Sequence, residues 1–149
     1  MRTFELPAET QAATGFTHKT VISHNALVEA ADNTAQTLTL LTAPANSIIK
    51  DAALFLPTPF QRTGTTAYNS NTIVVGIAGT TNQLLASTQI NANNGTPVTA
   101  ARFNSNTPIV YTSATPIIAT VASMASYDLA ELDAGEVEIF LSLVPLAQY

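Results

Sequence analysis

Apolar and polar residues alternate along residues 136–144, near the end of the chain. From Val137 onward, every second position is valine, isoleucine or leucine, and glutamate or serine stands at several positions between them. A period of two is typical of a β-strand that buries one face. The preceding segment, residues 117–124, is rich in β-branched residues, and an acidic link ending at Gly135 follows it. We therefore expect two strands joined by a hairpin or a short crossover.

Short segments of similar character recur at intervals of roughly ten residues through the rest of the chain. An apolar stripe with the period of a helix is missing from the sequence, and we expect only a single helical turn, within residues 126–132. This pattern predicts an all-β fold, an antiparallel two-layer β-sandwich that is jelly-roll-like and has about eight strands. The strands expected before the last pair cover residues 19–28, 36–42, 47–56, 72–78, 83–90, 97–103 and 109–115.

Turn residues predict how some of these strands connect. The short link around Pro44 indicates that residues 36–42 and 47–56 are antiparallel neighbours. Gly76 interrupts an otherwise apolar strand, which favours a bulge or a close neighbour at that position. The strongest two-residue hairpin signal is Asn94-Gly95.

Residues 1–17 contain mainly small and polar residues, among which Phe4, Leu6 and Phe16 are isolated apolar positions. We expect an irregular N-terminal arm over residues 1–17 and a β-sandwich domain over residues 18–149. A short helix over residues 8–13 would be marginal alone, and terminal disorder is the alternative. A segment of this kind can anchor a partner through a few apolar side chains, so Phe4, Leu6 and Phe16 are the candidate assembly contacts.

Charged residues make up only 10% of the 149 residues, against about 25% in a typical soluble domain. Threonine, serine, asparagine, glutamine and alanine take their place, so the surface is largely neutral and lacks the like-charge repulsion that keeps monomers apart. We expect this surface to contact other protein, and we expect a homo-oligomer, either a trimer or a dimer. A monomeric threonine-rich β-domain is the alternative, since strands favour threonine in any setting.

The net charge of −5 and five scattered basic residues argue against binding to nucleic acid, which needs clustered lysine and arginine. Glu5 and Glu9 stand where a signal peptide would need its apolar core, and no apolar run reaches the length of a membrane span. We expect a soluble protein that is made in the cytoplasm and has no membrane partner. The absence of cysteine excludes disulfides and thiolate nucleophiles.

Candidate catalytic and metal-binding residues are few. His18 and His24 fall on the same face of a continuous strand, but no third ligand accompanies them. The acidic residues between Asp128 and Glu138 do not follow the spacing of a calcium-binding EF-hand, so a solvated acidic loop is the better interpretation. There is no G-x-S-x-G nucleophile motif. We predict a protein that is not an enzyme and has no catalytic, cofactor or metal site.

Four stretches together resemble the small jelly-roll proteins of tailed bacteriophage virions. They are A-P-A-N-S-I-I-K-D-A, V-V-G-I-A-G-T-T-N-Q-L-L-A, P-I-I-A-T-V and L-D-A-G-E-V-E-I-F-L, within residues 19–144. The resemblance implies a structural virion protein of the head decoration or cement type. Such a protein lies on the capsid surface, binds the major capsid protein of an assembled shell and stabilises that shell. The family offers no active-site residues to carry over.

A second class of function stays open from the sequence. A receptor- or carbohydrate-binding β-sandwich of a phage tail or fibre would display aromatic side chains on exposed loops. Tyr68, Tyr111 and Tyr127 are the candidates for such a platform.

Overall fold

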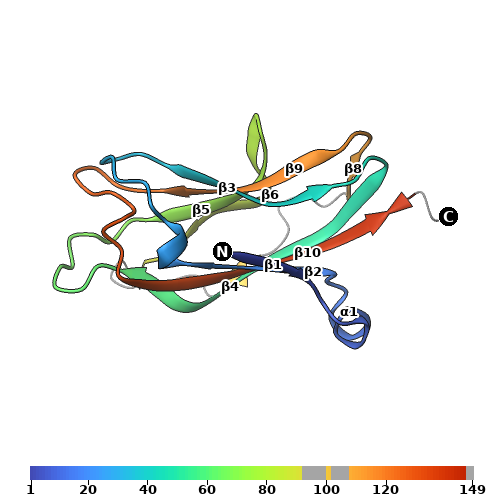
Figure 1. Ribbon diagram of the computed structural model, residues 1–149, viewed down its shortest axis with the longest axis horizontal. Helices are drawn as coiled ribbons and strands as arrows, with labels where there is room; N and C mark the ends of the chain where they lie inside the picture. Colours follow the sequence, from blue (N-terminus) through green and yellow to red (C-terminus); the bar gives the residue numbers. More distant parts are fainter. Residues whose placement is uncertain (92–99, 102–107, 147–149) are drawn as a thin grey trace.

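The computed structural model describes residues 1–91, 100–101 and 108–146, which form two antiparallel sheets packed face to face (Figure 1). The prediction of a two-layer antiparallel β-sandwich is confirmed. The first sheet has the order β1-β2-β10-β4-β7, with β8 also on β4, and the second has the order β3-β9-β5-β6. The strands of the first sheet are β1 (Arg2–Glu5), β2 (His18–Ser23), β4 (Ser47–Gln61), β7 (Ala100–Ala101), β8 (Ile109–Tyr111) and β10 (Ala134–Pro145). Those of the second sheet are β3 (Gln36–Ala43), β5 (Thr72–Ile77), β6 (Thr80–Gln89) and β9 (Thr115–Ala122).

The core lies between the sheets and consists of the apolar residues that point inward from each strand. In β10, Val137, Ile139 and Leu141 are at most 1% exposed, as the alternation along residues 136–144 predicts. Ile117 and Ile73 face them from the second sheet and are equally buried. Burial of this kind contributes about 2 kcal/mol for each large aliphatic side chain, so the two inner faces hold the layers together.

One predicted strand pair is wrong. β3 and β4 were expected to be neighbours, yet β3 pairs with β9 in the second sheet while β4 pairs with β10 in the first. The last two strands, β9 and β10, belong to different sheets, so of the two connections expected between them the structure has the crossover and not the hairpin. Alternation shows that a strand buries one face, but it does not show which sheet that strand joins.

The acidic link contains turns and not the expected helical turn. Within residues 123–133 the amide of Tyr127 donates to the Met124 carbonyl at 3.2 Å, and the amide of Leu132 donates to the Leu129 carbonyl at 3.3 Å. Ser126 has a positive φ of 65°, which a continuing helix does not allow. These single turns carry the chain from one sheet to the other.

The N-terminal residues differ from the irregular arm expected over residues 1–17. Arg2–Glu5 form the edge strand β1, which pairs antiparallel with β2. Helix α1 (Ala8–Thr14) follows and ends at Gly15, whose left-handed φ of 78° lets its amide donate to the Gln11 carbonyl. A 3-10 turn, η1 (His24–Ala26), follows β2. In the part of the chain that the structure describes, no helix is long and apolar enough to cross a membrane.

Gly76 lies where β5 and β6 approach most closely, as the sequence predicts. A Cβ atom at this position would stand 2.2 Å from the carbonyl oxygen of Thr80. The β5–β6 register shifts on both sides of Val75, so a bulge accompanies the close approach. The predicted hairpin signal at Asn94-Gly95 lies outside the described residues.

We predict that Gly76→Ala destabilises the fold by about 2 to 3 kcal/mol, because its methyl group would overlap backbone atoms that cannot move away cheaply. Urea unfolding followed by circular dichroism measures the change. The control is Gly64→Ala, at a position with φ +86° and no atom within 4 Å of the added Cβ. That variant should lose only about 1 kcal/mol, the cost of the left-handed backbone. An equal loss of unfolding free energy in the two variants would contradict a close contact between Gly76 and the backbone of β6.

Candidate functional site

The three residues expected to make assembly contacts have different environments. Phe4 lies on the edge strand β1 with 44% of its surface exposed, so it is available to a partner. Leu6 is 8% exposed and belongs to the core, which makes it a support for β1 rather than a contact. Phe16 is half-buried, and its ring packs against that of Phe140 at a centroid distance of 5.7 Å.

Outward-facing residues of the first sheet gather into a surface that we call the aromatic face. Residues directly opposite one another in antiparallel strands share a face, and the register places Phe4 beside Lys19, and Lys19 beside Phe140. Phe55 of β4 stands opposite Glu138 in the same sheet and is 47% exposed. The aromatic face consists of Phe4, Phe16, Val21, Phe55 and Phe140.

Two charged residues within the aromatic face form an ion pair. Lys19 Nζ is 2.5 Å from a carboxylate oxygen of Glu138, and both side chains are largely buried, at 21% and 17% exposed. The same ammonium group lies 5.4 Å from the centre of the Phe140 ring. A cation over an aromatic ring is attracted by the ring's quadrupole. The surface therefore combines apolar and aromatic side chains with an ion pair and with the exposed Arg2, which stands opposite Val21, a composition typical of protein contact sites.

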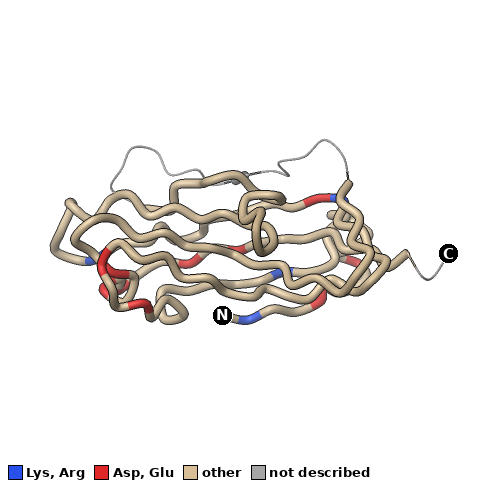
Figure 2. The backbone as a smooth tube through the Cα atoms, turned by 90° about the horizontal axis from the view of Figure 1, so that it is seen from above, with Lys and Arg blue, Asp and Glu red and all other residues tan. Residues whose placement is uncertain are grey.

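The second sheet presents a different surface, without any charged residue. The strands β3, β5, β6 and β9 contain no aspartate, glutamate, lysine or arginine, and the charged positions of the chain lie elsewhere (Figure 2). On its outer side, Thr37 stands opposite Thr120, and their hydroxyl oxygens are 3.3 Å apart. Val74 stands on the other side of Thr120. Threonine hydroxyls both donate and accept hydrogen bonds, so this face can contact many kinds of neutral surface.

The tyrosines proposed as a sugar-binding platform do not form one. Tyr68 is fully buried, and Tyr111 is 5% exposed. Burial raises the pKa of Tyr111 to about 12, and it raises the pKa of Tyr68 as well. Tyr127 stacks on Tyr68 with ring centroids 4.7 Å apart. Aromatic side chains that could stack on a sugar therefore do not come from these three positions.

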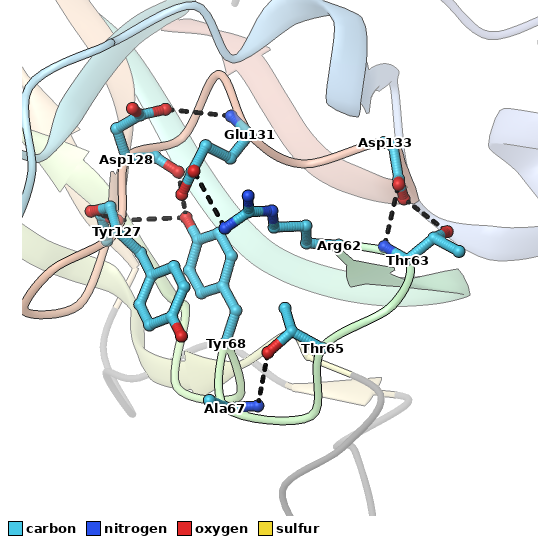
Figure 3. A network of polar contacts seen from close by, with 10 residues as sticks. Arg62, Thr63, Thr65, Ala67, Tyr68, Tyr127, Asp128, Glu131 and Asp133 are labelled. Carbon is cyan, nitrogen blue, oxygen red and sulfur yellow. Dashed lines mark hydrogen bonds and ion pairs between the residues drawn. The ribbon is translucent and has the colours of Figure 1, made fainter.

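Tyr68 instead joins two long loops at one end of the sandwich (Figure 3). Its hydroxyl donates to the Asp128 carbonyl at 2.5 Å and lies 3.1 Å from the Ser123 hydroxyl. From the other side, the Asn71 side-chain amide donates to the Tyr68 oxygen at 3.2 Å. The loop after β4 is thereby attached to the crossover between β9 and β10.

The acidic residues of the crossover stabilise the same pair of loops. Asp133 accepts hydrogen bonds from the Thr63 amide at 2.8 Å and from the Thr63 hydroxyl at 3.0 Å (Figure 3). Arg62 forms an ion pair with Glu131 at 2.9 Å. The described residues contain no group of three or more side chains that could hold a metal ion. These carboxylates have a structural role that the interpretation as a solvated loop missed.

The two histidines are not brought together. His18 belongs to β2, and its Nδ1 lies 2.8 Å from the Thr17 hydroxyl. His24 begins the 3-10 turn η1, after the strand has ended. The expected shared strand face does not exist, because β2 stops at Ser23.

Comparison with known proteins shows likeness in fold only. No protein-family model and no curated protein matches the sequence. A chain of the cyanophage Pam1 capsid asymmetric unit superposes with a TM-score of 0.58 and 14% identity, over 83% of this chain and 79% of its own. A chain of the acidic stable capsid of Helicobacter pylori bacteriophage KHP30 superposes with a TM-score of 0.52 and 12% identity, over 97% of this chain and 93% of its own.

We predict that Tyr68→Phe destabilises the protein by about 1 to 3 kcal/mol, because the partners of the hydroxyl, the buried Asn71 side chain among them, lose a hydrogen bond. Denaturant unfolding measures the loss. Tyr127→Phe is the matched control, since it keeps the ring that stacks on Tyr68 and should change stability by less than about 0.5 kcal/mol. An unchanged midpoint in Tyr68→Phe would show that the hydroxyl does not hold the loops.

Proposed function

We propose that this chain is a structural protein of a bacteriophage virion, a decoration or cement protein that binds the outside of an assembled head and stabilises it. One observation carries the proposal. The chain matches two phage capsid chains over most of its own length and over most of theirs. The matched share of this chain is similar to the matched share of the other chain in each case, so each matched chain is about as long as this one. The likeness thus covers most of this sequence and most of each matched chain.

The aromatic face is the surface that we assign to the shell. Phe4 and Phe55 offer exposed rings, while Phe16 and Phe140 form a half-buried base beside them. Aromatic side chains give large contact area at low entropic cost, and they dominate the binding energy of many interfaces. Leu6 would act indirectly, by fixing β1 and hence Phe4 to the domain.

Contact between copies is assigned to the neutral face of the second sheet. In a two-fold contact the same patch meets itself, and charged groups near the axis would then meet their own copies. A face whose four strands carry no charge avoids that repulsion. Its hydroxyls suit self-contact too, since each can donate to or accept from its counterpart. Such two-fold contacts would form a homodimer, and a homotrimer would instead pair two different parts of the same uncharged face.

Repeated weak contacts on a lattice explain how such a protein could stabilise a shell. When an oligomer binds several equivalent sites, the later contacts become intramolecular, and avidity rises by about 10² to 10⁴ over one contact. Free shell subunits offer one site at a time and should bind poorly. A ligand that prefers the assembled state also favours that state, so the occupied shell should resist heat and dissociation better than the bare one.

Particle composition tests the function directly. Virions that contain this chain should release it in a fixed stoichiometry to the major capsid protein, measured by quantitative mass spectrometry of purified particles. Bare shells should bind the recombinant protein until the same ratio is reached. A chain that sediments with tails or fibres, and not with heads, would support the receptor-binding alternative instead.

We predict that replacing Phe4 and Phe55 together by serine lowers the affinity for bare shells about tenfold or more, because aromatic anchors are the usual hot spots of interfaces. Occupancy is measured by co-sedimentation over a range of protein concentrations. The control is Val28→Ser, which removes a side chain that is 69% exposed and lies outside the aromatic face. All variants should unfold near the wild-type temperature, since the substituted residues are exposed. Undiminished binding by the double variant would reject this face as the contact.

A further inference from the structure

A cleft of about 420 Å³ opens between the two sheets on the side where β1, β2 and β3 lie. One wall comes from the first sheet and helix α1, and the other from β3 and the turn that follows it. This volume falls within the range of about 300 to 1,000 Å³ that is usual for binding pockets. Its lining includes Glu5, Gln11, His18, Leu41, Pro44 and Leu143.

Hydrogen bonds around Thr17 hold the ring of His18 in place. The Thr17 hydroxyl donates its one proton to the Leu141 carbonyl at 3.1 Å. The same oxygen accepts from the Leu143 amide at 2.9 Å, and His18 Nδ1 lies 2.8 Å from it. In the tautomer whose Nδ1 donates to this oxygen, Nε2 is an acceptor in the neutral ring. Burial agrees with this, because it lowers the pKa of His18 more than the nearby Glu5 carboxylate raises it.

Glu5 adds a negative charge to the same wall. It stands opposite His18 in the β1–β2 pair, and its carboxylate accepts from the Gln11 side-chain amide at 3.3 Å. Leu41 and Thr42 from β3 and Leu143 and Pro145 from β10 bring no charge to the lining. The cleft therefore joins hydrogen-bond acceptors and one negative charge to an apolar wall.

We propose that this cleft binds a lysine or arginine side chain carried on an extended segment of a partner protein. Ammonium and guanidinium groups are donors without acceptor capacity, so they match Glu5 and the Nε2 atom of His18. The aliphatic stem of either side chain would pack along Leu41 and Leu143, as such stems do on apolar surface. The edge strand β3 pairs only with β9 among the described strands, so its outer edge can receive an extended backbone. The proposal does not depend on the virion function.

Nuclear magnetic resonance titration with a blocked valine-arginine-valine peptide tests the proposal on the isolated protein. The matched probe is the same peptide with citrulline, which keeps the shape of arginine without its charge. We expect the arginine peptide to shift the amide signals of Glu5, His18 and Leu41 saturably, and to bind about tenfold more tightly than the citrulline peptide. Equal affinity for the two peptides, or shifts confined to residues outside the cleft, would overturn the proposal.

Two variants separate a cleft contact from general attraction to an acidic protein. Glu5→Gln should weaken arginine-peptide binding roughly three- to tenfold, whereas Glu9→Gln, which makes the same charge change on α1 outside the lining, should leave it unchanged. Lowering the pH from about 7.5 to about 5 should also weaken binding, since protonated His18 loses its acceptor and repels a cation. His18→Gln should remove that pH dependence. Equal effects of the two glutamate substitutions would overturn the assignment to the cleft.

Discussion

The antiparallel pair of β4 and β10 is the interaction on which the rest of the structure depends. It runs from Ala134 opposite Gln61 to Pro145 opposite Ser47, and it joins the middle of the chain to its end. Of the remaining strands of the first sheet, β2 pairs with β10, β7 and β8 pair with β4, and β1 attaches through β2. A register shift lies between Ser142 and Leu143, where three consecutive residues of β10 are buried. The bulge therefore bends the long pair over the core.

The two sides of the sandwich close differently, and this difference produces the cleft. On the side of β4 and β6, the Phe60 amide donates to the Ile90 carbonyl at 2.7 Å, so the sheets are joined by backbone. The buried Asn91 side chain adds a bond from its amide to the Phe60 carbonyl at 3.3 Å. On the side of β1 and β3 the lining consists of side chains from separate elements. Backbone hydrogen bonds close the side of β4 and β6, whereas the side of β1 and β3 has the open cleft in which we propose a ligand binds.

Local features of the fold could be predicted from the sequence, whereas its long-range pairing could not. The alternation after Val137 identified a half-buried strand, and Gly76 marked a close approach, because each depends on neighbours along the chain. The pairing of β10 with β4 depends on residues far apart, which no local pattern encodes. All four residues of β1 are exposed, so the strand has no alternation of buried and exposed positions from which it could have been predicted. Phe140 stands at one of the outward-facing positions of β10, where the sequence otherwise has glutamate or serine. An aromatic residue at such a position could have revealed the aromatic face.

The scarcity of charge has a different consequence on each surface of the molecule. Lys19 and Arg62 are held in ion pairs with glutamates, so little of their field reaches beyond the protein. The net charge of −5 still makes copies repel one another, but salt screens that repulsion beyond about 8 Å at physiological ionic strength. Contact through the second sheet would bring together strands without charge, while the acidic groups of the crossover and of the cleft remain outside it. Close packing of copies is then compatible with an acidic chain, because the charges and the contact lie on different elements.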